Sequence, residues 1–356
     1  MPRLIPISGL IAKAPACFLV ETDGARLLLD FGEGPPPGHI PDPKRIGEVD
    51  ALIFSHQHLD HIGAIEHLEK IGGPQVFATE VVARALPADL AISYLPMTGT
   101  ANILGIPVRT GRSGHAPGGI WIHFAIGGGL IYMGDNCTSS LLYAHDAPPE
   151  AATLILDCSY GVDDKPFAEG QQALLALAAA GPLLLPSVPQ GRGPEMALHF
   201  LRNGIMPHID DTLRAAIIGM RTECLLPEIR ADFARLRDAP SIPETPSGVM
   251  LAGPGGADKG NSKQLVDKWK DDPRVQIVFT GFLDPTLPAA QSVTDGRASV
   301  VRWKIHPSLS ENAATVRAVG ANTVLPCFGG SAADLPKWQQ AFAPARVVIE
   351  NDALEL

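Results

Sequence analysis

The sequence is poor in cysteine and has no C-x-x-C pair, which excludes motifs built on that spacing. Its five cysteines are odd in number and widely spaced: Cys17, Cys137, Cys158, Cys224 and Cys327. This usage is typical of a reducing compartment, because paired cysteines accumulate in oxidising ones. We therefore expect a cytoplasmic protein.

Long apolar runs are also missing. The longest, residues 173–185, is interrupted by Gly181 and Pro182 and falls short of the roughly 20 residues that cross a bilayer. Near the first residue, a short apolar stretch is broken by Pro6 and Pro15, which is a poor match to a signal peptide. We expect no membrane segment and no cleaved leader.

Positive charge is scarce as well, with 28 Lys and Arg residues against 38 Asp and Glu residues and a net charge of −10. No whole-molecule positive field draws in nucleic acid, although a local basic cleft can still bind it. What the chain has in plenty is apolar side chains, at 46% of 356 residues. That is enough to fill the core of two domains, or of one domain that carries an insertion.

Apolar runs between Gly- and Pro-bearing turns predict strands, and Ala-, Leu- and Arg-rich stretches after residue 167 predict helices of a second α/β unit. Strands are expected at 17–20, 26–30, 51–55, 76–78, 120–124, 130–133, 153–156, 183–185, 249–251, 276–280, 300–305, 323–326 and 347–349. Helices are expected at 62–71, 169–180, 195–202, 225–237, 261–270 and 311–319. The pattern predicts a mixed α/β protein.

The densest group of potential metal ligands is H-Q-H-L-D-H, which follows the expected strand at 51–55. In extended backbone, residues i and i+2 point to the same side, so His56 and His58 can converge on one metal ion. Asp60 and His61, where the chain turns toward a helix, can face a second ion. Imidazole and carboxylate ligands suit zinc, with manganese, iron or cobalt as alternatives. Solvated or core histidines are the less favoured interpretation, because only 11 residues are histidine.

Two later segments add ligand candidates. His115 stands in the glycine-framed loop S-G-H-A-P-G-G, where the backbone can approach an ion closely. Asp135 ends the apolar run L-I-Y-M-G-D and is placed as a ligand that bridges two ions would be. A turn residue or helix N-cap is the alternative for Asp135.

Together, H-x-H-x-D-H, the later G-H-x-x-G and the strand-ending G-D resemble the metallo-β-lactamase superfamily, and residues 29–32 resemble its D-x-G turn. The resemblance implies an αββα sandwich. It implies that one ion is held by His56, His58 and His115, that a second is held by Asp60 and His61, and that Asp135 bridges them.

The second half resembles the β-CASP branch of this superfamily, a group of RNA- and DNA-processing nucleases. The run at 154–161, L-I-L-D-C-S-Y-G, is similar to its acidic strand motif and would make Asp157 its first accessory carboxylate. Residues 186–195 are similar to the proline, glycine-arginine and glutamate run of its cap, and Gly281-Phe282-Leu283 stands where the branch has G-Y-Q. I-H-P-S matches the histidine of S-A-H-A-D at His306.

This resemblance implies three segments: a metallo-β-lactamase domain at 1–161, an inserted β-CASP-like α/β cap domain at 162–303, and the return to the first domain at 304–356. The chain departs from the family in three ways. Phe328 stands in L-P-C-F-G where the family has the last metal-binding histidine of V-H-G, so a second ion loses a ligand unless Cys327 or a neighbouring group substitutes. Ser308 replaces an aspartate after the histidine motif, and the cap is short for this branch.

Metal-activated hydroxide is the expected nucleophile, because a bound ion lowers the pKa of water toward about 7. Asp60 would orient it. His306 would protonate the departing oxygen, or else be a strand-end histidine bonded to backbone. Asp157 would fix the tautomer of a metal-bound histidine. Arg192 would contact substrate phosphate, or else pair with Glu195.

The expected function is that of a zinc-dependent hydrolase, with one or two Zn²⁺ ions and Mn²⁺ or Fe²⁺ as alternatives. A phosphodiesterase or ribonuclease of RNA processing is favoured, with RNA preferred over DNA as substrate; the oligomeric state is left open. Two other functions stay open: a small-molecule hydrolase (lactonase, thioesterase or phosphodiesterase), favoured by Phe328, the short cap and the acidic balance, and a catalytically weakened paralogue that binds nucleic acid.

Overall fold

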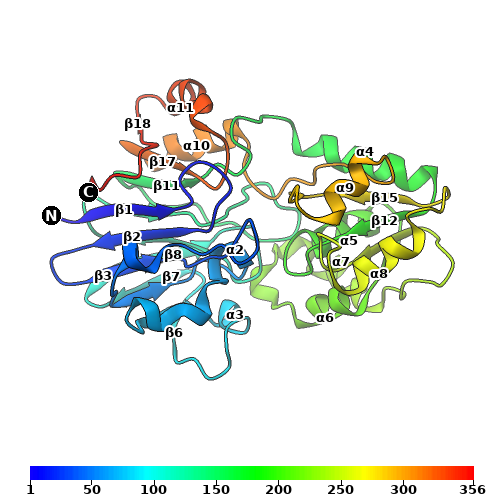
Figure 1. Cartoon of the computed structure of the whole chain (residues 1–356), viewed down its shortest axis with the longest axis horizontal. Coiled ribbons are helices and arrows are strands. Elements are labelled where there is room, and N and C mark those ends of the chain that lie inside the picture. Colours follow the sequence, from blue (N-terminus) through cyan, green and yellow to red (C-terminus); the bar gives the residue numbers. More distant parts are fainter. The chain divides into compact units, whose positions relative to one another are not determined.

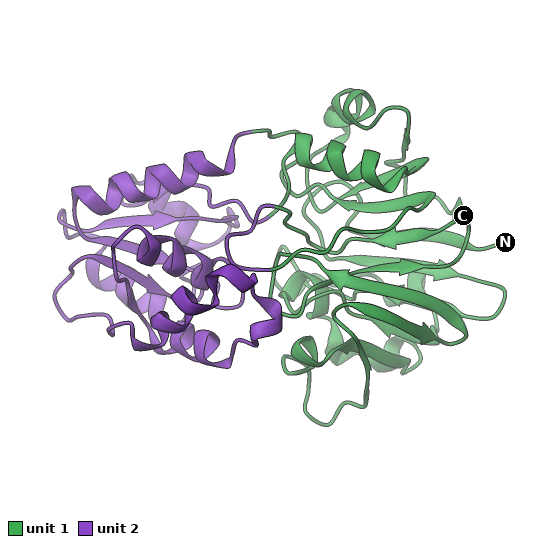
Figure 2. Cartoon of the chain, turned by 180° about the vertical axis from the view of Figure 1, so that it is seen from behind, with its two compact units in different colours: residues 1–138, 144–164, 306–356 green, residues 139–143, 165–305 purple.

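The computed structural model describes residues 1–356, which cluster into two compact units (Figure 2). Unit 1 comprises Met1–Thr138, Ala144–Asp164 and His306–Leu356, and unit 2 comprises Ser139–Tyr143 and Lys165–Ile305. Apart from the short segment Ser139–Tyr143, the chain therefore passes from unit 1 to unit 2 after residue 164 and returns after residue 305. The boundaries of folding domains, expected at 161 and 303, stay a prediction.

Unit 1 contains two seven-stranded mixed sheets (Figure 1). In spatial order, the first is β19 (Leu354–Glu355), β1 (Arg3–Ser8), β2 (Cys17–Glu21), β3 (Arg26–Leu29), β4 (Ala51–Ile53), β5 (Gln75–Thr79) and β6 (Ile92–Leu95). The second is β18 (Arg346–Val347), β17 (Thr323–Cys327), β11 (Thr153–Asp157), β10 (Leu130–Tyr132), β9 (Ile120–Phe124), β8 (Ile106–Arg112) and β7 (Gly99–Ile103). Strands β3 to β6 run parallel, as do β10, β11, β17 and β18.

Alternation along the strands produces the layers of unit 1. Leu27 and Leu29 of β3 belong to the core that also contains Tyr132 of the other sheet, whereas Leu28 between them packs with Phe54 in the outer core. Helices supply the rest of each outer core. On the first sheet they are α1 (Pro43–Ile46), α2 (Leu59–Ile62), η1 (Ile65–Ile71) and α3 (Glu80–Ala83). On the second they are α10 (Leu309–Val319) and α11 (Leu335–Phe342), the latter preceded by η5 (Ala332–Asp334). The expected αββα sandwich is confirmed.

Local signals determine where α10 begins and ends. Ser308 accepts a hydrogen bond from the backbone N–H of Glu311, whose carboxylate accepts one from the N–H of Ser308 at 2.8 Å. This reciprocal capping satisfies two donors of the first turn. The helix ends at Gly320, whose φ of 67° is a left-handed conformation that glycine adopts without strain. The residue that replaces the family's aspartate, Ser308, is therefore a helix cap.

Unit 2 is an α/β unit around a five-stranded parallel sheet. Its strands, in spatial order, are β13 (His208–Ile209), β14 (Val249–Ala252), β12 (Leu183–Pro186), β15 (Gln276–Phe279) and β16 (Ser299–Val300). Its helices are α4 (Phe167–Ala180), α5 (Arg192–Arg202), α6 (Asp211–Gly219), η2 (Thr222–Cys224), η3 (Pro227–Ile229), α7 (Arg230–Arg235), η4 (Leu236–Asp238), α8 (Gly260–Trp269) and α9 (Pro288–Thr294). Every residue of β12 and β14 is buried, as expected where helices cover both faces of a parallel sheet. The inserted α/β unit is confirmed.

Several expected elements differ. The helix at 62–71 is the 3₁₀ segment η1, kinked at His67, after the short α2. The helix at 225–237 is divided into η3, α7 and η4, because Pro227 starts its own short turn and Ile229 has a ψ of only −4°. In place of the strand expected at 300–305, only Ser299–Val300 pairs, since its parallel partner β15 ends at Phe279. The strand at 347–349 is Arg346–Val347, and Ile349 instead donates its N–H to the side chain of Glu350. No helix combines the length and apolarity that a membrane span requires.

Candidate metal centre

The predicted ligands follow the carboxyl ends of strands in unit 1 and lie in loops or in the short helix α2. His56 and His58 follow β4, and His61 lies in α2. His115 lies in the loop between β8 and β9, and Asp135 follows β10. The loops at such strand ends are where a rigid sheet can position side chains for binding.

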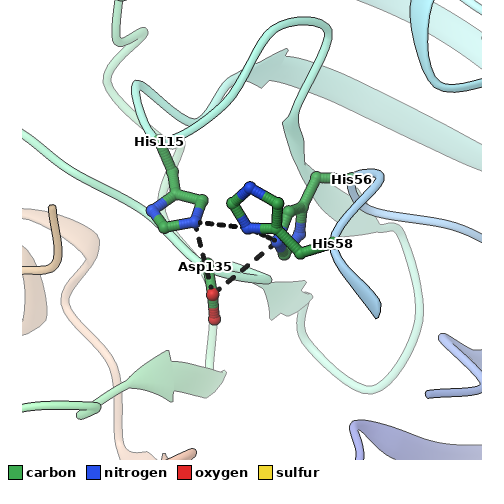
Figure 3. Close-up of side chains that lie close together, drawn as sticks. All are labelled: His56, His58, His115 and Asp135. Carbon is green, nitrogen blue, oxygen red and sulfur yellow. Dashed lines mark hydrogen bonds and ion pairs between the residues drawn. The ribbon is translucent and has the colours of Figure 1, made fainter. Parts of the chain in front are cut away.

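Three imidazoles and one carboxylate converge on one point (Figure 3). We call His56, His58, His115 and Asp135 the first ligand group. Nδ1 of His58 lies 3.1 Å from Nε2 of His56 and 3.0 Å from Nε2 of His115. Oδ2 of Asp135 lies 3.6 Å and 3.4 Å from these same two Nε2 atoms. Zinc–nitrogen bonds of about 2.0–2.1 Å in a tetrahedron separate the ligand atoms by about 3.3–3.4 Å, so the spacing fits such an ion.

A second set of potential ligands shares Asp135. We call Asp60, His61 and Asp135 the second ligand group. Nε2 of His61 lies 3.3 Å from Oδ1 of Asp135, and both atoms are buried without a hydrogen-bond partner. Buried polar atoms without partners are costly, which is the condition that a cation between them would relieve. All six residues expected as ligands therefore lie together; their role as ligands stays a prediction.

A buried carboxylate orients His61. Asp30 is fully buried and accepts hydrogen bonds from the backbone N–H and the hydroxyl of Ser55, at 2.7 and 2.6 Å, and from the hydroxyl of Tyr132. Its Oδ2 also lies 2.6 Å from Nδ1 of His61, which leaves Nε2 to face Asp135. Such outer partners select the tautomer of a ligand histidine. The D-x-G resemblance marked Asp30 as a turn residue, but sequence reasoning missed it as part of the site.

The charges of the centre follow from burial and from close partners. Burial, together with the neighbouring His61, lowers the pKa of His56, so its imidazole is neutral, which is the form that binds a metal. Burial alone would lower the pKa of His61 too, but the carboxylates of Asp135 and Asp30 outweigh it and raise that pKa. Burial would raise the pKa of Asp135, and His61 with His306 lowers it instead. The carboxylate is therefore ionised.

Lys13 is a cation of the centre that sequence reasoning missed. It lies in the loop between β1 and β2, and its ammonium donates a hydrogen bond to Oδ2 of Asp60. The side chains are 28% and 20% exposed. Burial would lower the pKa of Lys13, but the carboxylates of Asp60 and Asp135 raise it above its usual range. Nothing in the local pattern of residues 9–16 marks this lysine, because its partner is 47 residues away.

Asp157 and His306 form a pair beside the first ligand group. Nδ1 of His306 lies 2.8 Å from Oδ2 of Asp157 and 3.9 Å from Oδ2 of Asp135. The imidazole also lies 4.7 Å, between ring centroids, from that of His115. Asp157 was expected to orient a metal-bound histidine; in the structure its carboxylate contacts His306 and accepts hydrogen bonds from the N–H groups of Asn136 and Ser159.

Phe328 lies where the resemblance placed a histidine. It follows β17, is 2% exposed, and its ring centroid is 5.1 Å from that of His61 in an edge-on contact. Cys327, the expected substitute, is fully buried, and its thiol donates to the carbonyl of Leu325 at 3.3 Å. Burial raises the pKa of that thiol, so it is not a thiolate, and it belongs to neither ligand group.

Arg192 belongs to unit 2, where it begins α5. Its guanidinium packs so closely against Gly281 that a Cβ atom there would lie 1.9 Å from Nη1. The buried carboxylate of Glu195 accepts hydrogen bonds from the hydroxyl of Ser140 at 2.8 Å and from the indole N–H of Trp303 at 2.9 Å. Glu195 thus connects Ser140 and Trp303 within unit 2. The role of Arg192 in binding substrate stays a prediction.

Comparison with known proteins agrees with this fold. Residues 12–135 match the metallo-β-lactamase superfamily. The chain is 24% identical over 391 residues to the transcription termination factor FttA of Methanosarcina mazei, which covers 88% of this chain but 60% of that protein. It is 26% identical over 350 residues to ribonuclease TTHA0252 of Thermus thermophilus, covering 79% of each. A crystal structure of an Enterococcus faecalis protein of unknown function matches the whole chain with a TM-score of 0.60 at 12% identity, which shows a shared fold.

Proposed function

Because residues 12–135 match the metallo-β-lactamase superfamily, we propose that the chain is a metal-dependent phosphodiesterase that cleaves RNA. One observation carries the proposal: the four ligand atoms of the first ligand group converge at spacings of 3.0–3.6 Å. The relative that carries the name ribonuclease supports RNA as the substrate class.

Zinc is the proposed ion. Three imidazole nitrogens and one carboxylate oxygen are a donor set that favours zinc over magnesium or calcium, which prefer oxygen ligands. When bound, such an ion makes hydroxide available near neutral pH and neutralises charge that develops on a phosphoryl group.

Residues of the chain supply the remaining steps. The ionised carboxylate of Asp60 faces the centre and is placed to accept a hydrogen bond from an attacking water. Because Asp157 engages Nδ1 of His306, Nε2 of that imidazole is left to hold a proton and deliver it to the departing ribose oxygen. Arg192 of unit 2 would contact a phosphate of the substrate through its planar guanidinium.

A second candidate is hydrolysis of a small ester by the same centre. The net charge of −10 favours it, because a polyanion such as RNA is repelled by a protein of the same sign except at a local basic surface. Both candidates use the first ligand group, so only the substrate distinguishes them.

The test uses the full chain loaded with Zn²⁺ and three substrates: a labelled single-stranded RNA of mixed sequence, the matching DNA, and bis(p-nitrophenyl) phosphate. We expect the RNA to be cut, and we expect His58→Ala to lose its zinc and at least about 100-fold of the activity. The matched control is His39→Ala, which removes an exposed histidine outside both ligand groups.

Zinc-loaded protein that leaves RNA intact but hydrolyses the small ester would replace the first candidate by the second. Protein that binds no zinc, or whose RNA cleavage survives in His58→Ala, would refute both.

A further inference from the structure

We propose that the ammonium of Lys13 takes the place of a second metal ion, so that the protein binds one ion per chain, in the first ligand group. The inference rests on the proposed metal centre and deepens it, because it names which cation stands at the second ligand group.

The first argument is the position of the charge. Lys13 donates a hydrogen bond to Asp60, which belongs to the second ligand group and not to the first. An ion coordinated by Asp60 would lie within a few ångströms of the ammonium, and two cations at such a distance repel strongly in a partly buried site. The ion pair therefore competes directly with a second ion for the same carboxylate.

The second argument is the number of ligands. The second ligand group offers one imidazole and two carboxylates, and Asp135 is shared with the first ligand group. On the side of β17 the adjoining residue is Phe328, whose ring packs edge-on against His61 and cannot coordinate. The neighbouring thiol of Cys327 is directed to a backbone carbonyl. A second ion would lack the donors that make binding tight.

The third argument is that Lys13 and Phe328 are held by one connected backbone arrangement. Ile11 and Ala12, directly before the lysine, have φ angles of 39° and 66°, and Phe328 has a φ of 67°. Non-glycine residues adopt such angles only where surrounding contacts hold them. Here Ile11 donates its N–H to the carbonyl of Pro326 at 3.0 Å, and Phe328 donates its N–H to the carbonyl of Gly9 at 2.8 Å. The loop that carries Lys13 is thus hydrogen-bonded to the segment that has Phe328 where the family has a histidine.

This exchange changes how positive charge acts on an anionic substrate. A second ion would accept electron pairs from substrate oxygens, whereas an ammonium can only donate hydrogen bonds to them. Lys13 would neutralise Asp60 and present its remaining N–H groups beside the single ion. The exchange replaces a divalent cation by a monovalent one, so the centre carries one positive charge fewer than a two-ion centre, and one metal-binding step is removed.

The test counts ions rather than turnover. Native mass spectrometry and elemental analysis of the full chain, equilibrated with excess Zn²⁺ and then freed of loosely bound metal, should give one ion per wild-type chain. The double variant Lys13→Met, Phe328→His should bind two, because it removes the ammonium and restores an imidazole at a φ that histidine tolerates better than phenylalanine. The matched control Lys13→Met, Phe328→Leu should stay at one.

Two ions in the wild type would overturn this inference and leave the proposed function standing, whereas no ion in any protein would overturn both. One ion in the wild type and one in the histidine double variant would show that Lys13 and Phe328 do not exclude the second ion. Should the double variant fail to fold, the single variants decide. In a zinc titration, Lys13→Met should then show a second binding event that is too weak to survive the removal of loose metal, but at least tenfold tighter than any second event in Lys13→Arg. Equal affinities in the two single variants would overturn the inference.

Discussion

Oδ2 of Asp30 lies 2.6 Å from Nδ1 of His61, and the same oxygen accepts hydrogen bonds from the hydroxyls of Ser55 and Tyr132. One fully buried carboxylate thus joins β3, β4, β10 and α2 where they meet at the centre. Ser55 extends the connection, because its hydroxyl also lies 3.1 Å from Nδ1 of His56. Stability and metal binding should therefore depend on the same side chain.

The substitution Asp30→Asn should weaken both. The amide has only one accepting oxygen, so buried donors around Oδ2 are left without a partner, at a cost of about 3 kcal/mol in the free energy of unfolding. Affinity for Zn²⁺ should fall by about 10- to 100-fold. Urea unfolding of protein freed of metal by a chelator measures the loss of stability. Titration with Zn²⁺ measures the loss of affinity. As a control, Asp50→Asn, whose exposed carboxylate accepts one N–H from Arg26, should cost about 1 kcal/mol or less. Equal losses in the two variants would contradict the role of Asp30.

Gly32→Ala should displace the H-x-H-x-D-H segment. A Cβ atom at residue 32 would lie 1.8 Å from the backbone oxygen of Asp60, so one of the two segments must move. Such overpacking costs about 1–3 kcal/mol or more, and the shift should also weaken metal binding because Asp60 and His61 move with the backbone. The control is Gly24→Ala, where a Cβ atom meets nothing within 4 Å. Thermal unfolding of both variants, with and without Zn²⁺, is the measurement, and an unchanged melting temperature in Gly32→Ala would refute the argument.

At the candidate metal centre, contacts between residues close together in the sequence were predictable, and contacts between distant residues were not. His56 and His58 belong to one short motif, and the period of extended backbone was enough to predict that they converge. The contacts of Lys13 with Asp60 and of Asp30 with Tyr132 join residues 47 and 102 positions apart. No local periodicity encodes such pairs, because they depend on how strands and loops far apart in the sequence are brought together by the fold.

The same reason explains the errors in secondary structure. The stretch at 225–237 has helical composition, but it is divided into three short helices, with Pro227 starting the first and Ile229, whose ψ is −4°, preceding the second. Strands β7 and β8 were not predicted at all, because eight of their twelve positions are exposed or partly exposed and their apolar alternation is weak. Tertiary contacts, rather than composition, decide such segments.

His306→Gln should separate proton delivery from metal binding. If Nε2 of His306 protonates the departing ribose oxygen, its loss should slow RNA cleavage by about 10²- to 10⁴-fold without changing the zinc content. Hydrolysis of bis(p-nitrophenyl) phosphate should change much less, because p-nitrophenolate departs without a proton. A His67→Gln variant, with the change in η1 away from both ligand groups, should retain both activities. A parallel loss on both substrates would instead point to a structural role for His306.

Asp146 should make stability depend on pH in the acid range. Its carboxylate accepts hydrogen bonds from the guanidinium of Arg112 at 2.6 and 2.9 Å and from the hydroxyl of Thr98 at 2.6 Å. Burial would raise the pKa of Asp146, but the bonds from Arg112 and Thr98 outweigh it and lower that pKa below its usual range. Because Arg112 directly precedes the loop that carries His115, this pair anchors one side of the candidate metal centre.

The sign follows from the lowered pKa. A carboxyl that is more acidic in the folded than in the unfolded chain contributes stability above its unfolded pKa of about 3.9, and loses it as the pH falls through the folded pKa. Asp146→Asn should therefore cost about 1–2 kcal/mol at pH 7 and progressively less below about pH 4. Urea unfolding of chelated protein from pH 3 to pH 8 measures this, with Asp89→Asn, a change at an exposed position, expected to follow the wild-type curve. A stability difference between wild type and Asp146→Asn that stays constant down to pH 3 would contradict this prediction. It would mean that the charge of the carboxylate does not contribute to the free energy of unfolding, and that Arg112 acts through packing alone.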